Sequence, residues 1–205
     1  MLKKPSNYDE VQVNQEFEKL ELGGHKGIII KIEEYTSPVS GKTSLKVYAD
    51  TSKDDKQPSY FKTQYENDTR QDKKYPNGGI KYISLGEEEN QVKMLKAFIT
   101  TVENSNPNFT YNWSKDETQL KGKSIGLVFA LEEYTKQDGS IGTATKLNQF
   151  RSIDKINDVK IPRVKLLDGS YVEYEEYQNN KNKKQNNDPF NDYNDVVEID
   201  DNFLD

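Results

Sequence analysis

Two stretches of the chain repeat one pattern, and this repetition limits the folds that the sequence can form. Residues 32–47 (IEEYTSPVSGKTSLKV) and residues 131–147 (LEEYTKQDGSIGTATKL) both contain EEYT, then a glycine-containing turn and then a threonine-rich segment. In residues 43–50, apolar and polar residues alternate as they do in a half-buried strand. Each stretch is therefore predicted to form an antiparallel β-hairpin, although the same pattern also builds hairpins in unrelated folds.

One segment between the two hairpins has the periodicity of a helix. Its apolar residues recur at helical spacing: Val92, Leu95, Phe98, Ile99 and Val102. Ser84 and Glu87 form an S-x-x-E pattern that predicts the start of this helix, and Pro107 predicts its end. Two hairpins separated by a helix suit the oligonucleotide- and oligosaccharide-binding (OB) type of barrel. We therefore expect a mainly β fold, an OB-like five-stranded Greek-key barrel with one inserted α-helix.

The third strand of the expected barrel lies between the first hairpin and the helix. Residues 60–65 (YFKTQY) are predicted to form it, with Phe61 and Tyr65 facing the core. The polar residues 66–79 that follow are predicted to form a long loop.

The residue types present exclude several classes of active site. The chain contains no cysteine and one histidine, His25, which excludes disulfides, thiolate metal sites and sites built from several histidines. His25 is expected at the surface or at a strand edge. The one tryptophan, Trp113, is expected to pack the helix onto the barrel. No cofactor or metal is predicted, and the chain is not expected to be an enzyme.

The acidic residues leave one catalytic alternative open. Asp50, Asp54, Asp55 and Glu66 could together hold the metal ion of a nuclease. Carboxylates in loops are usually solvated, however, and catalysis by paired acids needs two of them to converge on one site. We therefore treat a metal-dependent nuclease as the least favoured function.

Aromatic and basic residues are interleaved between residues 60 and 82, and they occur again in the last strand. Binding of a single nucleic-acid strand without sequence preference needs cations for the phosphates and flat rings for the bases. The candidate binding residues are as follows: Tyr60, Lys62, Arg70, Lys73, Lys74, Tyr75, Lys81, Tyr82, Lys146, Phe150 and Arg151. The alternative is that most of these rings belong to the core and that the lysines keep the protein soluble.

The last part of the chain differs from the rest in composition. Residues 173–205 contain ten acidic residues and three lysines, a net charge of −7, whereas the whole chain carries −6. We expect a single-stranded-DNA-binding domain over residues 1–172 and a disordered acidic tail over residues 173–205. The tail is either a solubilising segment or a docking peptide that also competes with DNA for the domain's basic groove. Docking would use the acidic and apolar residues at its end: Asp200, Asp201, Phe203 and Leu204.

The two hairpins, the segment LKGKSIGLVF and the acidic tail resemble phage-encoded single-stranded DNA-binding proteins of Gram-positive hosts. The resemblance covers most of the chain and rests on its organisation rather than on one diagnostic motif. It implies an OB fold, coating of single-stranded DNA, and recruitment of replication or recombination proteins by the acidic tail. The chain ends in IDDNFLD, without the Pro-Phe that often ends related bacterial proteins.

Charge and hydropathy also bear on partners and location. The nearly neutral residues 1–172 favour, as an alternative, a protein–protein adaptor or inhibitor that targets a host protein. No run approaches the ~20 apolar residues of a membrane span, and the N-terminus has no apolar signal core. We therefore expect no membrane contact and a location in the host cell cytoplasm. The sequence leaves open whether the chain forms a homo-oligomer.

Overall fold

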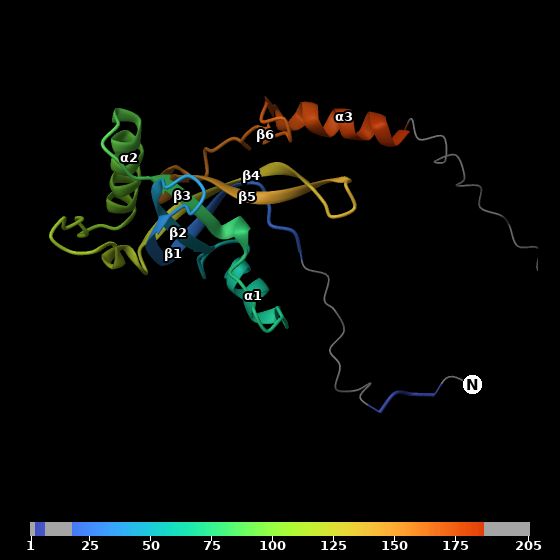
Figure 1. Cartoon of the computed structure of the whole chain (residues 1–205), viewed down its shortest axis with the longest axis horizontal. Helices are drawn as coiled ribbons and strands as arrows, with labels where there is room; N and C mark the ends of the chain where they lie inside the picture. The colour runs from blue at the N-terminus through green and yellow to red at the C-terminus, as the bar shows by residue number, and fades with distance from the viewer. Residues whose placement is uncertain (1–2, 7–17, 187–205) are drawn as a thin grey trace, which may run out of the picture.

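A computed structural model describes residues 3–6 and 18–186, and these residues form a mainly β structure (Figure 1). The strands are β1 (Gly23–Thr36), β2 (Thr43–Thr51), β3 (Ile80–Ser84), β4 (Ser124–Thr135), β5 (Ile141–Arg151), β6 (Val164–Lys165) and β7 (Tyr171–Val172). The α-helices are α1 (Tyr60–Asn67), α2 (Glu89–Ser105) and α3 (Tyr174–Asn186). Short 3₁₀ helices are η1 (Asn77–Gly79), η2 (Glu117–Leu120) and η3 (Ile153–Lys155). In Figure 1, α2 lies at one end of the sheet, and the β4–β5 hairpin extends toward the other.

The strands form one open mixed sheet of seven strands in the order β3-β2-β1-β4-β6-β7, with β5 paired to β4. All pairs are antiparallel except β4 with β6. β1 pairs with β4 only as far as Phe129, and β6 meets β4 further along, at Glu132. The expected closure into a barrel does not occur, because β3 pairs only with β2 and shares no ladder with β5.

The two predicted hairpins are confirmed, and both strands of each run close to their predicted limits. Alternation places Leu45, Val47 and Ala49 of β2 in the core. Residues 125–130 of β4 are buried without a break, so both faces of the strand are covered there. Ile156 covers one face, since a Cβ atom on Gly126 would lie 2.3 Å from its side chain. Burial of both faces accounts for the continuous apolar run of β4.

The prediction of a strand at residues 60–65 is wrong, because this segment is helix α1. The buried carboxylate of Asp50 accepts hydrogen bonds from the backbone N–H groups of Phe61 (2.8 Å) and Lys62 (3.0 Å). These donors at the start of a helix have no partner within the helix itself, so an acceptor there stabilises it. The cap comes from the end of β2, ten positions earlier in the chain, where a local pattern does not reveal it.

The third strand and the start of α2 also differ from expectation. Ser84 is the last residue of β3 and pairs with Ser44 of β2, so it does not cap the helix. Glu88 and Gln91 form the capping box of α2 instead. The helix buries Phe98, Ile99 and Val102 against the sheet, as the periodicity predicts.

The environments predicted for two single residues, His25 and Trp113, are wrong. His25 is 1% exposed rather than at the surface, and its ring lies edge-on to Phe129 with 5.4 Å between the ring centroids. Trp113 is 71% exposed and does not pack α2 onto the sheet. Phe61 is buried, as expected, while Tyr65 is only half-buried.

The segment predicted to be a disordered tail begins with a helix, α3. The hydroxyl of Tyr177 in α3 donates to Glu133 of β4 across 3.0 Å, which joins the helix to the β4–β5 hairpin. The tail residues Asp200, Asp201, Phe203 and Leu204 lie outside the described residues. Within the described ranges, no helix has both the length and the apolarity that a membrane span requires.

Candidate nucleic-acid interface

The gap between β3 and β5 is a groove, and α2 borders it. Its volume is about 510 Å³, and its lining includes Lys81 and Tyr82 of β3, Phe150 and Arg151 of β5, and Lys155 of η3. Amide side chains from α2 and β5 line it as well, and no carboxylate of the described residues does. We call this cavity the β3–β5 groove.

A second cavity of about 480 Å³ continues the groove along the same gap. The two cavities share Lys81 and Tyr82, and the second adds Lys146 of β5. At this end η1 packs tightly between the strands, since a Cβ atom on Gly78 would lie 2.8 Å from the carbonyl oxygen of Thr145. The glycines of the NGG sequence are therefore needed to bring β5 close to β3 at this point.

Lys81 lies where the groove meets the core. It pairs with Val47 across the β2–β3 ladder, so its side chain leaves the sheet on the face of the buried Val47 and Ile83. Burial lowers the pKa of Lys81, and the nearby charge of Glu132 offsets this in part. No described carboxylate is within ion-pair distance of Lys81. A half-buried ammonium group without a counter-ion favours the binding of an anion.

Phe150 forms the aromatic wall of the groove. Its ring is partly buried and packs against Phe98 of α2, with ring centroids 5.0 Å apart. Arg151, the next residue, is exposed at the end of β5. The structure therefore brings together several of the predicted binding residues: Lys81, Tyr82, Lys146, Phe150 and Arg151.

Tyr82 connects the groove to the outer face of the sheet. It is 45% exposed and lies opposite Lys46 of β2, whose ammonium nitrogen is 5.8 Å from the centre of the Tyr82 ring. The same nitrogen lies 4.8 Å from the ring of Tyr48 and 5.6 Å from that of Tyr35. Lys46, Tyr48 and Tyr35, all on the outer face, are not among the residues predicted from the sequence. The alternation in β2 contained the signal, because Lys46 and Tyr48 occupy the positions between the buried ones.

Two of the predicted rings are engaged in holding the fold. The hydroxyl of Tyr60 accepts a hydrogen bond from the backbone N–H of Leu20 across 3.1 Å. The hydroxyl of Tyr75 donates to the carbonyl oxygen of Ala49 across 2.9 Å, and burial raises the pKa of this phenol. Both rings pack against the hydrophobic core.

The remaining predicted cations lie on α1 and in the loop after it, and none of them lines the groove. Lys62 is 3.6 Å from Glu66 on the same helix. Arg70 donates to both oxygens of Asp68 and lowers the pKa of that carboxyl to about 2. The ammonium of Lys73 lies 4.8 Å from the centre of the Tyr65 ring, and Lys74 is exposed.

Two of the four acids considered for a nuclease site, Asp50 and Asp55, have other partners. Asp50 caps α1, and Asp55 accepts hydrogen bonds from His25 (2.8 Å) and from the backbone N–H of Lys26 (2.7 Å). Among the described residues, no group of three or more His, Cys, Asp and Glu side chains could hold a metal ion.

The chain was compared with known families and proteins. No protein-family model matches it, and none of the curated proteins matches its sequence. These comparisons therefore assign no function to the chain.

Proposed function

We propose that the protein binds single-stranded DNA without sequence preference through the β3–β5 groove. The observation that supports this most is the lining of the groove, where Lys81, Arg151 and Lys155 accompany three aromatic residues, Tyr82, Phe98 and Phe150, and no described carboxylate. The cations would neutralise phosphates, and Tyr82 and Phe150 would stack on bases. Such contacts do not distinguish one base from another, because every base has a flat face.

The order of the strands supports the same proposal. The path β3-β2-β1-β4-β5, with α2 inserted between β3 and β4 in sequence, is the arrangement expected of an OB-like barrel. Proteins with this fold bind oligonucleotides on the face of strands 2 and 3 and through the neighbouring loops. Here that face carries Lys46, Tyr48 and Tyr82, and Tyr35 of β1 lies beside them. Because β3 and β5 do not pair, the groove lies between them where a closed barrel would have a ladder.

The biological role that we propose is the coating of single-stranded DNA during phage replication or recombination, in the host cytoplasm. This role rests on the resemblance in sequence organisation to phage single-stranded DNA-binding proteins. In it the protein is a binding protein rather than an enzyme. The acidic end of the chain would recruit the replication or recombination partners.

Fluorescence anisotropy of a labelled oligo-dT strand tests the proposal. The logarithm of the association constant should fall linearly with the logarithm of salt concentration, because bound phosphates release counter-ions. Arg151→Gln should weaken binding several-fold, whereas Lys121→Gln, an exposed lysine outside the groove, should not. Absence of binding at low salt would refute the function.

A protein–protein adaptor is the second candidate, and the exposed Trp113 favours it. The loop that carries Trp113 is held by Gln119, which accepts from the backbone N–H of Asn112 (2.8 Å) and donates to the carbonyl oxygen of Asp116 (2.8 Å). A held, exposed indole is a frequent anchor in protein interfaces. Salt-insensitive capture of one host protein, lost in Trp113→Ala, together with no retention of DNA, would favour the adaptor.

A further inference from the structure

The second cavity, which continues the β3–β5 groove, does not end at Lys146. It shares Glu132 and Lys146 with a third cavity, of about 410 Å³, which lies along β4 and β5. The third cavity in turn shares Glu133 and Tyr134 with a fourth, of about 510 Å³, between the β4–β5 hairpin and α3. Four cavities thus follow one another along β5, from α2 at one end to α3 at the other. Glu133 and Thr143 of the fourth alternate with Glu132 and Ala144 of the third, so the path turns around the edge of the hairpin between them.

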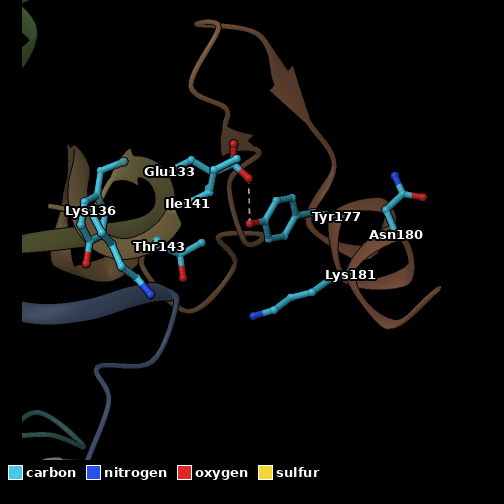
Figure 2. Close-up of a pocket in the computed structure, with 9 residues that line it drawn as sticks. Glu133, Lys136, Ile141, Thr143, Tyr177, Asn180 and Lys181 are labelled. Carbon is cyan, nitrogen blue, oxygen red and sulfur yellow. Dashed lines mark hydrogen bonds between the residues drawn. The ribbon is translucent and has the colours of Figure 1, made fainter. Parts of the chain in front are cut away.

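The fourth cavity contains two lysines that approach it from different elements. Figure 2 shows Lys136 on the hairpin and Lys181 on α3, with the Lys181 side chain extending from the helix toward the hairpin. Thr143 and Asn180 add polar groups to the lining, and Tyr134 adds a ring that is half-exposed. This combination of cations, a ring and hydrogen-bonding groups is the one found in the β3–β5 groove.

A hydrogen bond joins α3 to the hairpin. The Tyr177 hydroxyl donates to Oε1 of Glu133, as the dashed line in Figure 2 shows, and Oε2 of Glu133 accepts from the backbone N–H of Leu167 across 3.2 Å. Tyr177 and Lys181 are four residues apart and therefore lie on one face of the helix. The contact at Tyr177 thus directs Lys181 toward the cavity.

The two carboxylates along this path are already engaged. Glu132 forms an ion pair with Lys165 of β6. Glu133 accepts the two hydrogen bonds described above. Lys136, Lys146 and Lys181 therefore remain to attract an anion along the path.

We propose that a bound single strand continues past the β3–β5 groove, along β5, and ends beneath α3, where Lys136 and Lys181 hold its phosphates. This inference rests on the proposed function and extends the binding site to a second half. From Arg151 to Ile141 the strand β5 spans roughly 33 Å, at about 3.3 Å per residue. A short oligonucleotide fills only the groove, whereas a longer one also reaches α3.

The test compares oligo-dT strands of increasing length, from ~4 to ~16 nucleotides, the range of sites known for OB folds. The double variant Lys136→Gln/Lys181→Gln and wild type should have the same affinity for the shortest strand that wild type binds. For the longest strands its affinity should be about tenfold lower than that of wild type. The slope of the logarithm of the association constant against the logarithm of salt concentration should correspond to about two fewer phosphate contacts. Lys121→Gln is the matched control.

The outcomes separate the two proposals. Equal affinity of the double variant and wild type at every length would overturn the extension to α3 and leave the groove in place. Equal loss at every length would also overturn it, because the two lysines would then act on the groove itself. Absence of wild-type binding at all lengths would overturn both.

A distance measurement provides a readout that does not depend on affinity. The chain has no cysteine, so Gln137→Cys and Asn179→Cys can carry spin labels without other substitutions. Both positions are exposed, and neither lines the fourth cavity. A long strand should narrow the distribution of label distances, and a short strand should leave it unchanged. No change with the long strand would contradict the proposal.

Discussion

Nδ1 of His25 lies 2.8 Å from Oδ2 of Asp55, and this contact fastens the loop after β2 to the start of β1. Nε2 of the same ring lies 3.1 Å from the carbonyl oxygen of Glu21, so the ring also fastens the segment before β1. Asp55 accepts from two backbone N–H groups in addition, those of Lys26 and Gln57. One buried imidazole and one carboxylate thus join three segments of the chain.

Replacement of Asp55 by Ala should destabilise the fold. The buried His25 ring and two backbone donors would lose their acceptor, at a cost of about 3–5 kcal/mol for a buried pair broken on one side. Urea unfolding measures the loss. Asp54→Ala, at an exposed neighbouring position, is the control and should change stability by less than about 0.5 kcal/mol. A small effect of Asp55→Ala would show that water replaces the lost contacts.

Replacement of Lys81 by Met should weaken DNA binding and stabilise the protein. Burial lowers the pKa of Lys81, so its charged form is less favourable in the folded chain than in the unfolded one. A lysine whose pKa is lowered by folding makes the folded state more stable as pH rises from the folded pKa toward the unfolded value of about 10.4.

The free energy of unfolding of wild type and of Lys81→Met should therefore be measured in urea at two pH values. The variant should be the more stable protein at about pH 7, and its advantage should shrink near about pH 10. At neutral pH, the affinity of the variant for single-stranded DNA should be lower than that of wild type. A variant that is less stable at neutral pH would contradict the view that Lys81 is retained for binding.

Two tyrosines should behave in opposite ways. Tyr82→Ala should reduce affinity for single-stranded DNA by about 1–3 kcal/mol, the usual contribution of one stacked ring, with little change in stability. Tyr75→Phe should leave affinity unchanged and cost about 0.5–1.5 kcal/mol of stability, because it loses the hydrogen bond to Ala49. Anisotropy and urea unfolding of both variants check the pair. Reversed effects would place the stacking surface elsewhere.

Replacement of Tyr177 by Phe should weaken the binding of long DNA strands and leave the binding of short strands unchanged. The variant loses the hydrogen bond to Glu133 that joins α3 to the hairpin, while Lys181 keeps its charge. We expect a few-fold loss of affinity for long strands and none for short ones. Tyr174→Phe, at the start of the same helix, is the matched control. Unchanged binding of long strands by Tyr177→Phe would show that this contact does not position Lys181.

The sequence predicted those parts of the fold whose causes are local. Alternation located β2, and the helical period located α2. The segment YFKTQY fits either a strand or a helix, and the choice was made by Asp50, a residue remote from it that supplies the cap. The polar helix α3 has no apolar stripe, so no period could reveal it.

The candidate site was predicted only in part, because the local sequence does not show which rings the fold itself uses. Interleaved rings and cations indicated Lys81, Tyr82 and Phe150, which the structure gathers in one groove. Their neighbours in the sequence, Tyr60 and Tyr75, have the same chemistry, but their hydroxyls bond to the backbone of the fold. Only the tertiary fold distinguishes the rings that line the groove from the rings that hold the structure.

The lack of a ladder between β3 and β5 has a consequence for how a ligand enters. A closed barrel must break backbone hydrogen bonds before anything can pass between two of its strands. Here no such bond joins the described residues of β3 and β5, and side-chain packing such as that of Phe98 on Phe150 sets their separation. In the proposed binding mode, a base that enters this gap would therefore displace side-chain contacts and break no backbone hydrogen bond between β3 and β5.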